Sequence, residues 1–347
     1  MPHWLRFFAQ QWFLSILVVM IVGGMMLGAK GGPDAVKGIT GFIKPGPVTA
    51  IVLFLMAFTL DSRQLIHSFR FPQPVLWAAG VNMVVLPLMA WSLMPAQRYP
   101  DFAVGLMIAG SVPCTLAAAS VWTRKGRGND AVSLLVTLTT NGSCFLITPF
   151  WLSFATQAAD VKLPTGEIVS QLFWVVLIPT AIAQSLRLSA LCREFALSRK
   201  IVMGVAAQLL ILTLVGTSAC KGGLQLSTFG AGPSLSAVLL VWVCCAGIHL
   251  AGLLISYSGG RLWKFRLEDR IAVAFAGSQK TLPIGILLAT DAAIFGKQFP
   301  FAVFPMLMFH ATQLFLDTAV ADRFSKWVLQ AEAKASRAET GDARPST

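Results

Sequence analysis

The chain has 347 residues, of which 56% are hydrophobic and only 12% are charged, whereas a typical soluble domain carries about 25% charged residues. Its mean hydropathy of +0.71 excludes an ordinary soluble enzyme and predicts an integral membrane protein. A net charge of +12 suggests nucleic acid as the partner of a soluble protein. Here the basic residues lie between apolar runs, so we expect the lipid bilayer as a partner and no nucleic acid.

Ten apolar runs are long enough to cross a bilayer as helices, which takes about 20 residues. They lack the alternation of polar and apolar residues that is typical of membrane β-barrels, so the sequence predicts an all-α integral membrane protein. The expected spans, in chain order, are 11–29, 46–64, 75–95, 102–123, 130–154, 167–187, 200–218, 234–258, 270–290 and 299–322.

The basic residues predict the orientation of the chain. Nineteen of the 27 Lys and Arg residues fall in the termini and in the loops that lie on the same side as the termini, and seven fall in the opposite loops. Cytoplasmic loops carry the excess of Lys and Arg, so we expect a multi-pass protein of the inner (plasma) membrane with both termini in the cytoplasm. Residues 326–347 form a polar cytoplasmic tail, which we expect to be disordered from Ala331 onwards.

A short sequence recurs in the fourth and ninth spans. The first copy reads AGSVPCTLAAA from Ala109, and the second reads AGSQKTLPIGI from Ala276. Each copy lies in the fourth span of a five-span half, and an odd number of spans makes the second half enter the membrane from the opposite face. This arrangement predicts two inverted repeats, residues 1–158 and 159–325, of the kind found in many secondary transporters.

Each copy also carries a proline, Pro113 in the first and Pro283 in the second. Proline removes a backbone donor and clashes with the preceding turn, so we expect both helices to be broken. Broken helices at membrane depth line cavities or are buried in protein. A simple proline kink is the alternative interpretation at each position.

Three segments resemble a known family. They are VPCTLAAASVWTRKGRGNDAVSLLVTLTTNGSCFLITP from Val112, FAGSQKTLPIG from Phe275, and MLMFHATQL from Met306. On these segments the chain is similar to the bile acid:sodium symporter superfamily, in particular the branch with the motif G-S-Q-K-[ST]-L. The resemblance implies a panel domain and a core domain with helices four and nine crossing in the core. It also implies two sodium ions beside the crossing and an organic anion between panel and core.

The sodium ligands that the resemblance implies are only partly present. Ser133 and Thr137 match the family's pair after Gly-Asn and share one helical face, and Ser120 stands at a third ligand position. The family's asparagine next to Ser120 is absent, and Phe275 occupies the position of the glutamate that bridges both ions. A charged ion without a carboxylate is costly in a membrane. We therefore expect at most a weak sodium site at these three hydroxyls, and no other cofactor or metal.

At the second site the family's two glutamines correspond to Asn82 and Gln279, and Lys280 follows directly. Lys280 lies near the middle of its span, about ten residues from either end. We expect its ammonium to replace a bound cation and to face Gln279, Asn82 and the anion cavity, because intramembrane charges are usually functional. A lysine that extends to the interface is the alternative, and proton exchange by Lys280 stays open.

Other polar residues are candidates to bind the substrate or an ion. Ser278, Thr115 and Thr281 flank the two prolines, and at least one of the two threonines is expected to bond a freed backbone group. His310 is expected to titrate, to bond across the core or to be a satisfied core residue. Asp61 and Asp317 are candidate partners of Lys280.

The sequence favours a secondary transporter of a small organic anion that works by alternating access. The retained Ser133, Thr137 and Gln279 and both prolines support transport. The loss of the bridging glutamate supports the alternative, a non-transporting membrane regulator or receptor on the same fold. No enzyme is expected, because the sequence contains no H-E-x-x-H, Walker A or G-x-S-x-G motif and no paired carboxylates in a span.

Overall fold

The computed structural model describes residues 12–60, 72–157, 163–229, 232–291, 294–295 and 299–339. These residues form helices and loops without any strand, as the apolar runs predicted. In the described part of the chain eight helices are long and apolar enough to cross a membrane, so the protein is a multi-pass membrane protein. They are Ser15–Thr40, Gln73–Ala96, Asp130–Thr156, Thr165–Leu186, Lys200–Thr228, Leu235–Leu262, Leu267–Thr290 and Val303–Ala333.

The two other expected spans take different forms. In place of the span 46–64, α3 (Pro45–Thr59) is a shorter apolar helix of 15 residues, and Asp61 lies outside the described residues. In place of the span 102–123 there are two short helices, α7 (Pro100–Ser111) and α8 (Ala118–Lys125). Because this helix is interrupted, the fourth span contains no helix of 18 residues and is not among the eight.

Two segments are more helical than the sequence suggested. The first helix, α2 (Trp12–Thr40), continues through the expected loop after residue 29, with a kink at Gly32, where φ is 73° and Pro33 follows. The last helix, α17 (Val303–Glu339), runs through the domain boundary expected at residue 325. The expectation of disorder from Ala331 is therefore wrong for residues 331–339. Their sequence, AEAKASRAE, is rich in strong helix formers, which explains the extension.

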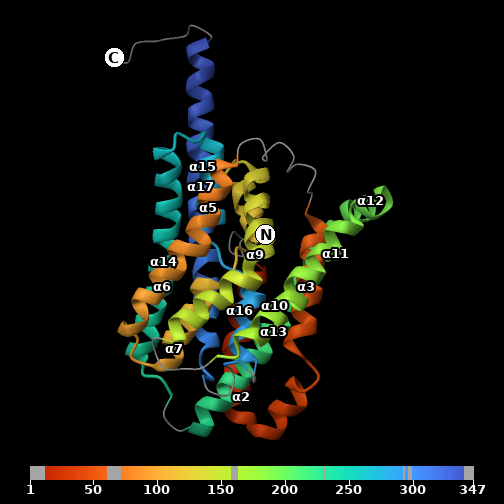
Figure 1. Cartoon of the computed structure of the whole chain (residues 1–347), viewed down its shortest axis with the longest axis vertical. Coiled ribbons are helices and arrows are strands. Elements are labelled where there is room, and N and C mark those ends of the chain that lie inside the picture. Colours follow the sequence, from red (N-terminus) through yellow and green to blue (C-terminus); the bar gives the residue numbers. More distant parts are fainter. Residues whose placement is uncertain are drawn as a thin grey trace, which may run out of the picture.

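The remaining helices complete two groups that pack mainly within themselves. Three of them, α10 (Thr165–Leu172), α11 (Ile178–Leu186) and α12 (Ala190–Ser198), lead to α13 (Lys200–Phe229). Among these elements α2, α3, α11 and α13 pack on one another. The second group is α5 (Gln73–Gly80), α6 (Leu86–Leu93), α7, α8, α9 (Asp130–Gln157), α14 (Leu235–Leu262), α15 (Leu267–Ser278) and α17 (Figure 1). The short helix α16 (Leu282–Thr290) packs on members of both groups.

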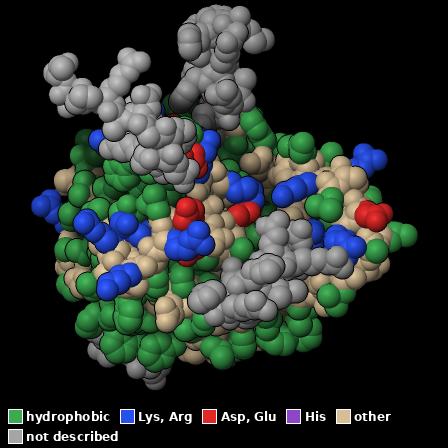
Figure 2. All heavy atoms as spheres, turned by 90° about the horizontal axis from the view of Figure 1, so that it is seen from above, with side chains coloured by type: hydrophobic (Ala, Val, Ile, Leu, Met, Phe, Trp, Pro, Cys, Tyr) green, Lys and Arg blue, Asp and Glu red, His purple; other side chains and the backbone are tan. Residues whose placement is uncertain are grey.

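The centre of the molecule is the segment that contains α15 and α16. It is the one candidate span among the described residues whose apolar window is wholly buried inside the protein, whereas the other spans leave much of their surface for lipid. Figure 2 looks onto the end from which α17 projects and shows Lys and Arg side chains across this face. A segment so enclosed is surrounded by protein groups, which makes its polar residues candidates for a site.

Candidate functional site at two broken helices

The interruption between α7 and α8 leaves five consecutive backbone carbonyls, from Ser111 to Thr115, outside the regular helical pattern. Buried carbonyls need partners, and each of these five accepts a hydrogen bond from outside the segment. The donors, in chain order of the carbonyls, are Thr148 Oγ1 (2.8 Å), Lys280 Nζ (2.8 Å), Thr281 N (3.0 Å), Asn141 Nδ2 (2.8 Å) and Thr137 Oγ1 (3.3 Å). Three side chains of α9, the Lys280 side chain and the Thr281 backbone therefore satisfy the carbonyls of the first interruption.

The second interruption separates α15 from α16 at residues 279–281. Its backbone contacts the first interruption directly, because Thr281 N donates to Pro113 O at 3.0 Å. Proline cannot donate a hydrogen bond to continue a helix, and Pro283 is at the start of α16. The two prolines therefore accompany two helix breaks that meet at the centre of the protein.

Asn82 connects this centre to the third span. It lies in a π-helical turn, Val81–Val85, in which Leu86 N donates to Val81 O. In this register the next donor would be the nitrogen of Pro87, which carries no hydrogen. The carbonyl of Asn82 is thus left for another donor. Its side-chain Nδ2 meanwhile donates to Gln279 O at 2.9 Å.

Lys280 supplies that donor. Its Nζ donates to Asn82 O at 2.6 Å, to Val112 O at 2.8 Å and to Asn82 Oδ1 at 3.2 Å. The side chain is completely buried. The ammonium is therefore enclosed by three oxygen acceptors inside the protein and does not extend to the membrane interface.

A buried carboxylate lies on the other side of the second break. Asp317 of α17 accepts a hydrogen bond from Gln279 Nε2 through Oδ2, and its Oδ1 lies 2.9 Å from His249 Nε2. The other ring nitrogen of His249 lies 3.3 Å from Ser278 O. Asp317 therefore bonds Gln279 and His249, and its ion pairs in the described part of the chain do not include Lys280.

The residues expected to hold sodium offer oxygen atoms without a negative charge. Ser120 Oγ and Ser133 Oγ are buried without a hydrogen-bond partner, as the oxygens of a cation site would be. Thr137 Oγ1 donates to Thr115 O at 3.3 Å. Phe275 packs its ring edge-on against Phe324, with centroids 5.8 Å apart. The free hydroxyls thus fit neutral ligands of a sodium ion, but Phe275 provides no carboxylate to offset its charge.

A cavity of about 980 Å³ opens between the two helix groups. Ala117 and Ala118 at the start of α8, and Leu282 and Pro283 at the start of α16, line one part of it. Four charged residues also line it: Arg124, Lys125, Asp130 and Lys200. Arg124 pairs with Asp130 at 2.6 Å, and Lys125 pairs with Asp322 at 2.9 Å.

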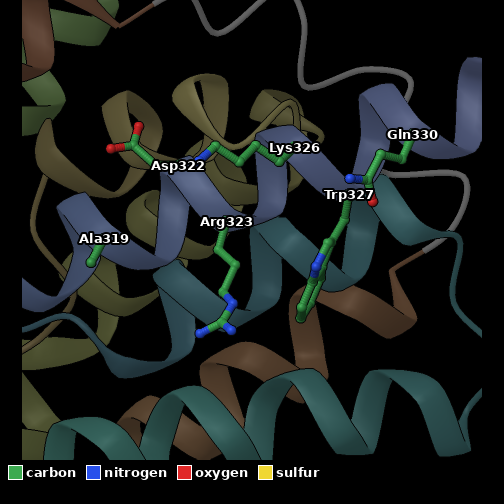
Figure 3. Close-up of a pocket in the computed structure, with 6 residues that line it drawn as sticks. All are labelled: Ala319, Asp322, Arg323, Lys326, Trp327 and Gln330. Atoms are coloured by element: carbon green, nitrogen blue, oxygen red, sulfur yellow. The ribbon is translucent and has the colours of Figure 1, made fainter.

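A second, smaller pocket of about 400 Å³ lies along α17 and shares no lining residue with the cavity. Figure 3 shows that its residues, Ala319, Asp322, Arg323, Lys326, Trp327 and Gln330, project from successive turns of this helix. Their spacing of three and four residues corresponds to one helical face. This pocket is therefore a groove on the surface of α17, separate from the broken helices.

The expected site residues fall into three places. Thr115, Ser120, Pro283 and His310 line the cavity. Asn82, Ser278, Gln279, Lys280 and Thr281 lie fully or almost fully buried at the second break, and Ser133 and Thr137 are buried on α9. Lys280 is not among the residues that line this cavity, so its ammonium does not face the cavity as the sequence had led us to expect. Thr115 Oγ1 accepts from Ala118 N at 3.4 Å, which is the backbone bond expected of one threonine.

Sequence reasoning missed two residues of this centre. His249 lies within the apolar eighth span, and its position alone marks it as an intramembrane ionisable residue. Gln313 lies three residues after His310 on α17, and its side chain bonds the backbone of Lys280. The contact of Gln313 depends on a residue 33 positions away, so no local pattern predicts it.

Comparison with known proteins assigns the family. The profile of the SBF-like CPA transporter family matches residues 11–326. The chain is 22% identical over 335 residues to sodium/bile acid cotransporter 7-B of Xenopus laevis, covering 92% of this chain and 93% of the relative. It is 20% identical over 333 residues to sodium/bile acid cotransporter 7 of Rattus norvegicus, covering 92% and 94%. It is 24% identical over 279 residues to an uncharacterised protein of Pseudomonas aeruginosa, covering 80% and 82%.

The extent of the family match, from the first described helix into the last, agrees with the resemblance of the three sequence segments. This family is one of transporters and not of enzymes. The chain belongs to the SBF-like CPA transporter family and is a membrane transporter of the bile acid:sodium symporter superfamily.

Proposed function

We propose that the protein is a secondary transporter that carries a small organic anion through the membrane by alternating access. One observation carries this proposal: α8 and α16 both begin at the wall of the 980 Å³ cavity. The N-terminus of a helix carries partial positive charge and free N–H groups. In secondary transporters such half-helix ends bind anionic groups of the substrate.

The proposed architecture is two inverted five-helix repeats, residues 1–158 and 159–325. The breaks in the fourth and ninth spans, with the repeated AGS and TL residues beside them, support this symmetry. The group of α2, α3, α11 and α13 corresponds to the panel, and the helices around α15 correspond to the core. The cavity lies between them, and transport would move the core relative to the panel.

Lys280 takes the place of a bound cation in this proposal. Its ammonium is surrounded by the oxygen atoms of Asn82 and Val112, and oxygen atoms are also the ligands of sodium. The protonated lysine therefore supplies positive charge at the crossing, and exchange of its proton during transport stays open. Sodium would bind weakly, if at all, to Ser120, Ser133 and Thr137, so its coupling to transport is doubtful.

The proposed location is the inner membrane with both termini in the cytoplasm and residues 326–347 on the cytoplasmic side. The excess of Lys and Arg on the corresponding loops supports it. A reporter that is active only outside the cytoplasm, fused to the C-terminus, should be silent. Activity of this fusion would contradict the orientation.

The test of the function uses purified protein in nanodiscs and three amphipathic carboxylates: cholate, decanoate and 2-naphthoate. Cholate is included because the curated relatives are named sodium/bile acid cotransporters. Each acid is compared with its uncharged methyl ester in a binding and thermal-stability assay. We expect at least one acid to bind and stabilise the protein while its ester does not. Equal effects of all acids and esters would contradict an anion site.

Uptake separates a transporter from a receptor on the same fold. The acid that binds is loaded outside proteoliposomes, and its accumulation inside is followed with time. A transporter moves it, whereas a non-transporting regulator binds it at the same affinity without uptake. Binding without any uptake would therefore favour the regulator.

A further inference from the structure

Among the residues that line the cavity, His310 combines deep burial with a free ring nitrogen. It is 7% exposed and lines the cavity. Its Nδ1 lies 2.9 Å from Gln313 Nε2, and the imidazole also interacts with the backbone of Lys280. Among the described residues Nε2 is not within hydrogen-bond distance and geometry of any partner. Which ring nitrogen carries the proton decides whether the cavity meets a donor or a lone pair.

Gln313 determines this choice through the backbone of Lys280. Lys280 N can only donate, and it bonds Gln313 Oε1 at 2.9 Å. Lys280 O can only accept, and it bonds Gln313 Nε2 at 3.0 Å. These two bonds fix which end of the Gln313 amide is oxygen and which is nitrogen.

The position of the nitrogen then fixes the histidine. An amide NH₂ group can donate two hydrogen bonds and cannot accept any. One hydrogen of Gln313 Nε2 goes to Lys280 O, and the other points at His310 Nδ1. That ring nitrogen must accept, so the proton of the neutral imidazole resides on Nε2. A protonated imidazolium would place two N–H groups against each other.

We propose that Gln313 locks His310 in the Nε2–H tautomer, so that His310 binds the anionic group of the substrate with a neutral N–H donor. His310 is thus the substrate-binding group, and Gln313 is a positioning residue that ties it to the second helix break. His310 lines the same cavity as the N-termini of α8 and α16, whose partial positive charge favours the same anion. This inference rests on the proposed transport of an organic anion.

The tautomer is measured directly on protein labelled with [¹⁵N]histidine in nanodiscs. The chain has four histidines, and the His310→Gln variant identifies the resonances of His310 by their loss. We expect an unprotonated Nδ1 and a protonated Nε2 at neutral pH. The Gln313→Met variant keeps a side chain of similar length but removes both amide contacts, and a second tautomer should then appear. A protonated Nδ1 in the wild-type protein overturns the proposal, whatever the protein transports.

Two variants at His310 test the donor without changing Gln313. A glutamine side chain places an N–H near the position of Nε2, whereas an asparagine side chain places one near Nδ1. With cholate, decanoate and 2-naphthoate as probes, His310→Gln should bind the best acid about as well as the wild type. His310→Asn should bind it about 10- to 100-fold more weakly, because a hydrogen bond to a charged group is lost.

The outcomes separate this inference from the proposed function. If the acids bind and the two His310 variants lose equal affinity, or neither loses any, the donor role is wrong and the anion transporter stands. If none of the acids binds the wild-type protein, both fall. If Gln313→Met does not fold, the spectrum of the wild-type protein and the affinities of His310→Gln and His310→Asn decide.

Discussion

The two helix breaks meet at one point but are held in different ways. The first is held largely by neutral groups of α9: Thr137, Asn141 and Thr148 donate to its carbonyls. The second is surrounded by α5–α6, α14 and α17, and it brings an ammonium, a carboxylate and an imidazole into contact with its backbone or side chains. The first break is a polar scaffold, and the second concentrates charge.

The difference bears on our proposal that Lys280 takes the place of a bound cation. Neutral hydroxyls and amides are sufficient to satisfy freed carbonyls, and the first break uses little else. The exception is Val112 O, which accepts from Lys280. That single contact joins the charge of the second break to the first, as a bound cation would do in our proposal. Removing charge should therefore affect both breaks, whereas removing a neutral donor should affect one.

The largest effect is expected for Lys280→Met, which keeps an apolar stem and removes the ammonium. The carbonyls of Asn82 and Val112 would lose their donor in a buried site. At about 1–3 kcal/mol for each unsatisfied group, the loss of stability should be about 2–6 kcal/mol. Thermal unfolding in detergent measures it, and binding of the acids should be lost as well.

Lys125→Met is the matched control for that change. Lys125 pairs with Asp322 near the surface, where the two side chains are 36% and 56% exposed, so the cost should be below about 1 kcal/mol. Lys280→Arg should also lose binding of the acids, because a planar guanidinium does not replace a compact ammonium. If Lys280→Met were as stable as Lys125→Met and bound the acids normally, the special role of Lys280 would be refuted.

An intermediate effect is expected for Asn141→Leu at the first break. Asn141 Nδ2 donates to Cys114 O and Thr137 O, both at 2.8 Å, and leucine leaves Cys114 O unsatisfied. The cost should be about 1–3 kcal/mol, measured as a lower unfolding temperature. Ser143→Ala on the same helix is the control, with an expected change within about 0.5 kcal/mol. A loss of stability as large as that of Lys280→Met would contradict the contrast between a first break held by neutral donors and a second break held by charged groups.

A smaller effect, which depends on the presence of sodium, is expected for Phe275→Glu. This variant returns a carboxylate to the position implied by the family resemblance. The free Ser120 and Ser133 hydroxyls would then have an acidic neighbour for a sodium ion. We expect sodium to stabilise this variant relative to potassium, by about 1.4 kcal/mol at ten times its dissociation constant. Phe275→Gln should show no such gain, and equal behaviour of the two variants would argue against this position as a sodium ligand.

The helical class and both breaks could be predicted from the sequence, because they depend on local signals. Apolar runs mark spans, and Pro113 and Pro283 interrupt helices for steric reasons. The end of α17 was misjudged because its polar residues suggested a tail, although Ala, Glu and Lys also favour helix. Local composition therefore predicts helix interiors better than helix ends.

The contacts between the residues of the site could be predicted only in part. From the family positions we expected Lys280 to face Asn82, and its Nζ donates to two oxygen atoms of Asn82. The hydrogen bonds of Gln313 to the Lys280 backbone and the His249–Asp317 pair could not be inferred, because each joins residues far apart in the chain. The Asn82 carbonyl is freed locally, by the π-helical turn before Pro87, and this change of helical register was not expected from the sequence. The enclosure of the Lys280 ammonium away from the cavity depends on these same contacts.

The most direct test of the central claim, that Lys280 replaces the bound cation, is a sodium titration of the wild-type protein. Thermal stability and acid binding are measured while sodium replaces potassium at constant ionic strength. We expect neither quantity to change, because the ammonium already occupies the crossing and the hydroxyls of Ser120, Ser133 and Thr137 carry no charge. Saturable stabilisation at low sodium concentration, abolished by Thr137→Ala, would contradict the account.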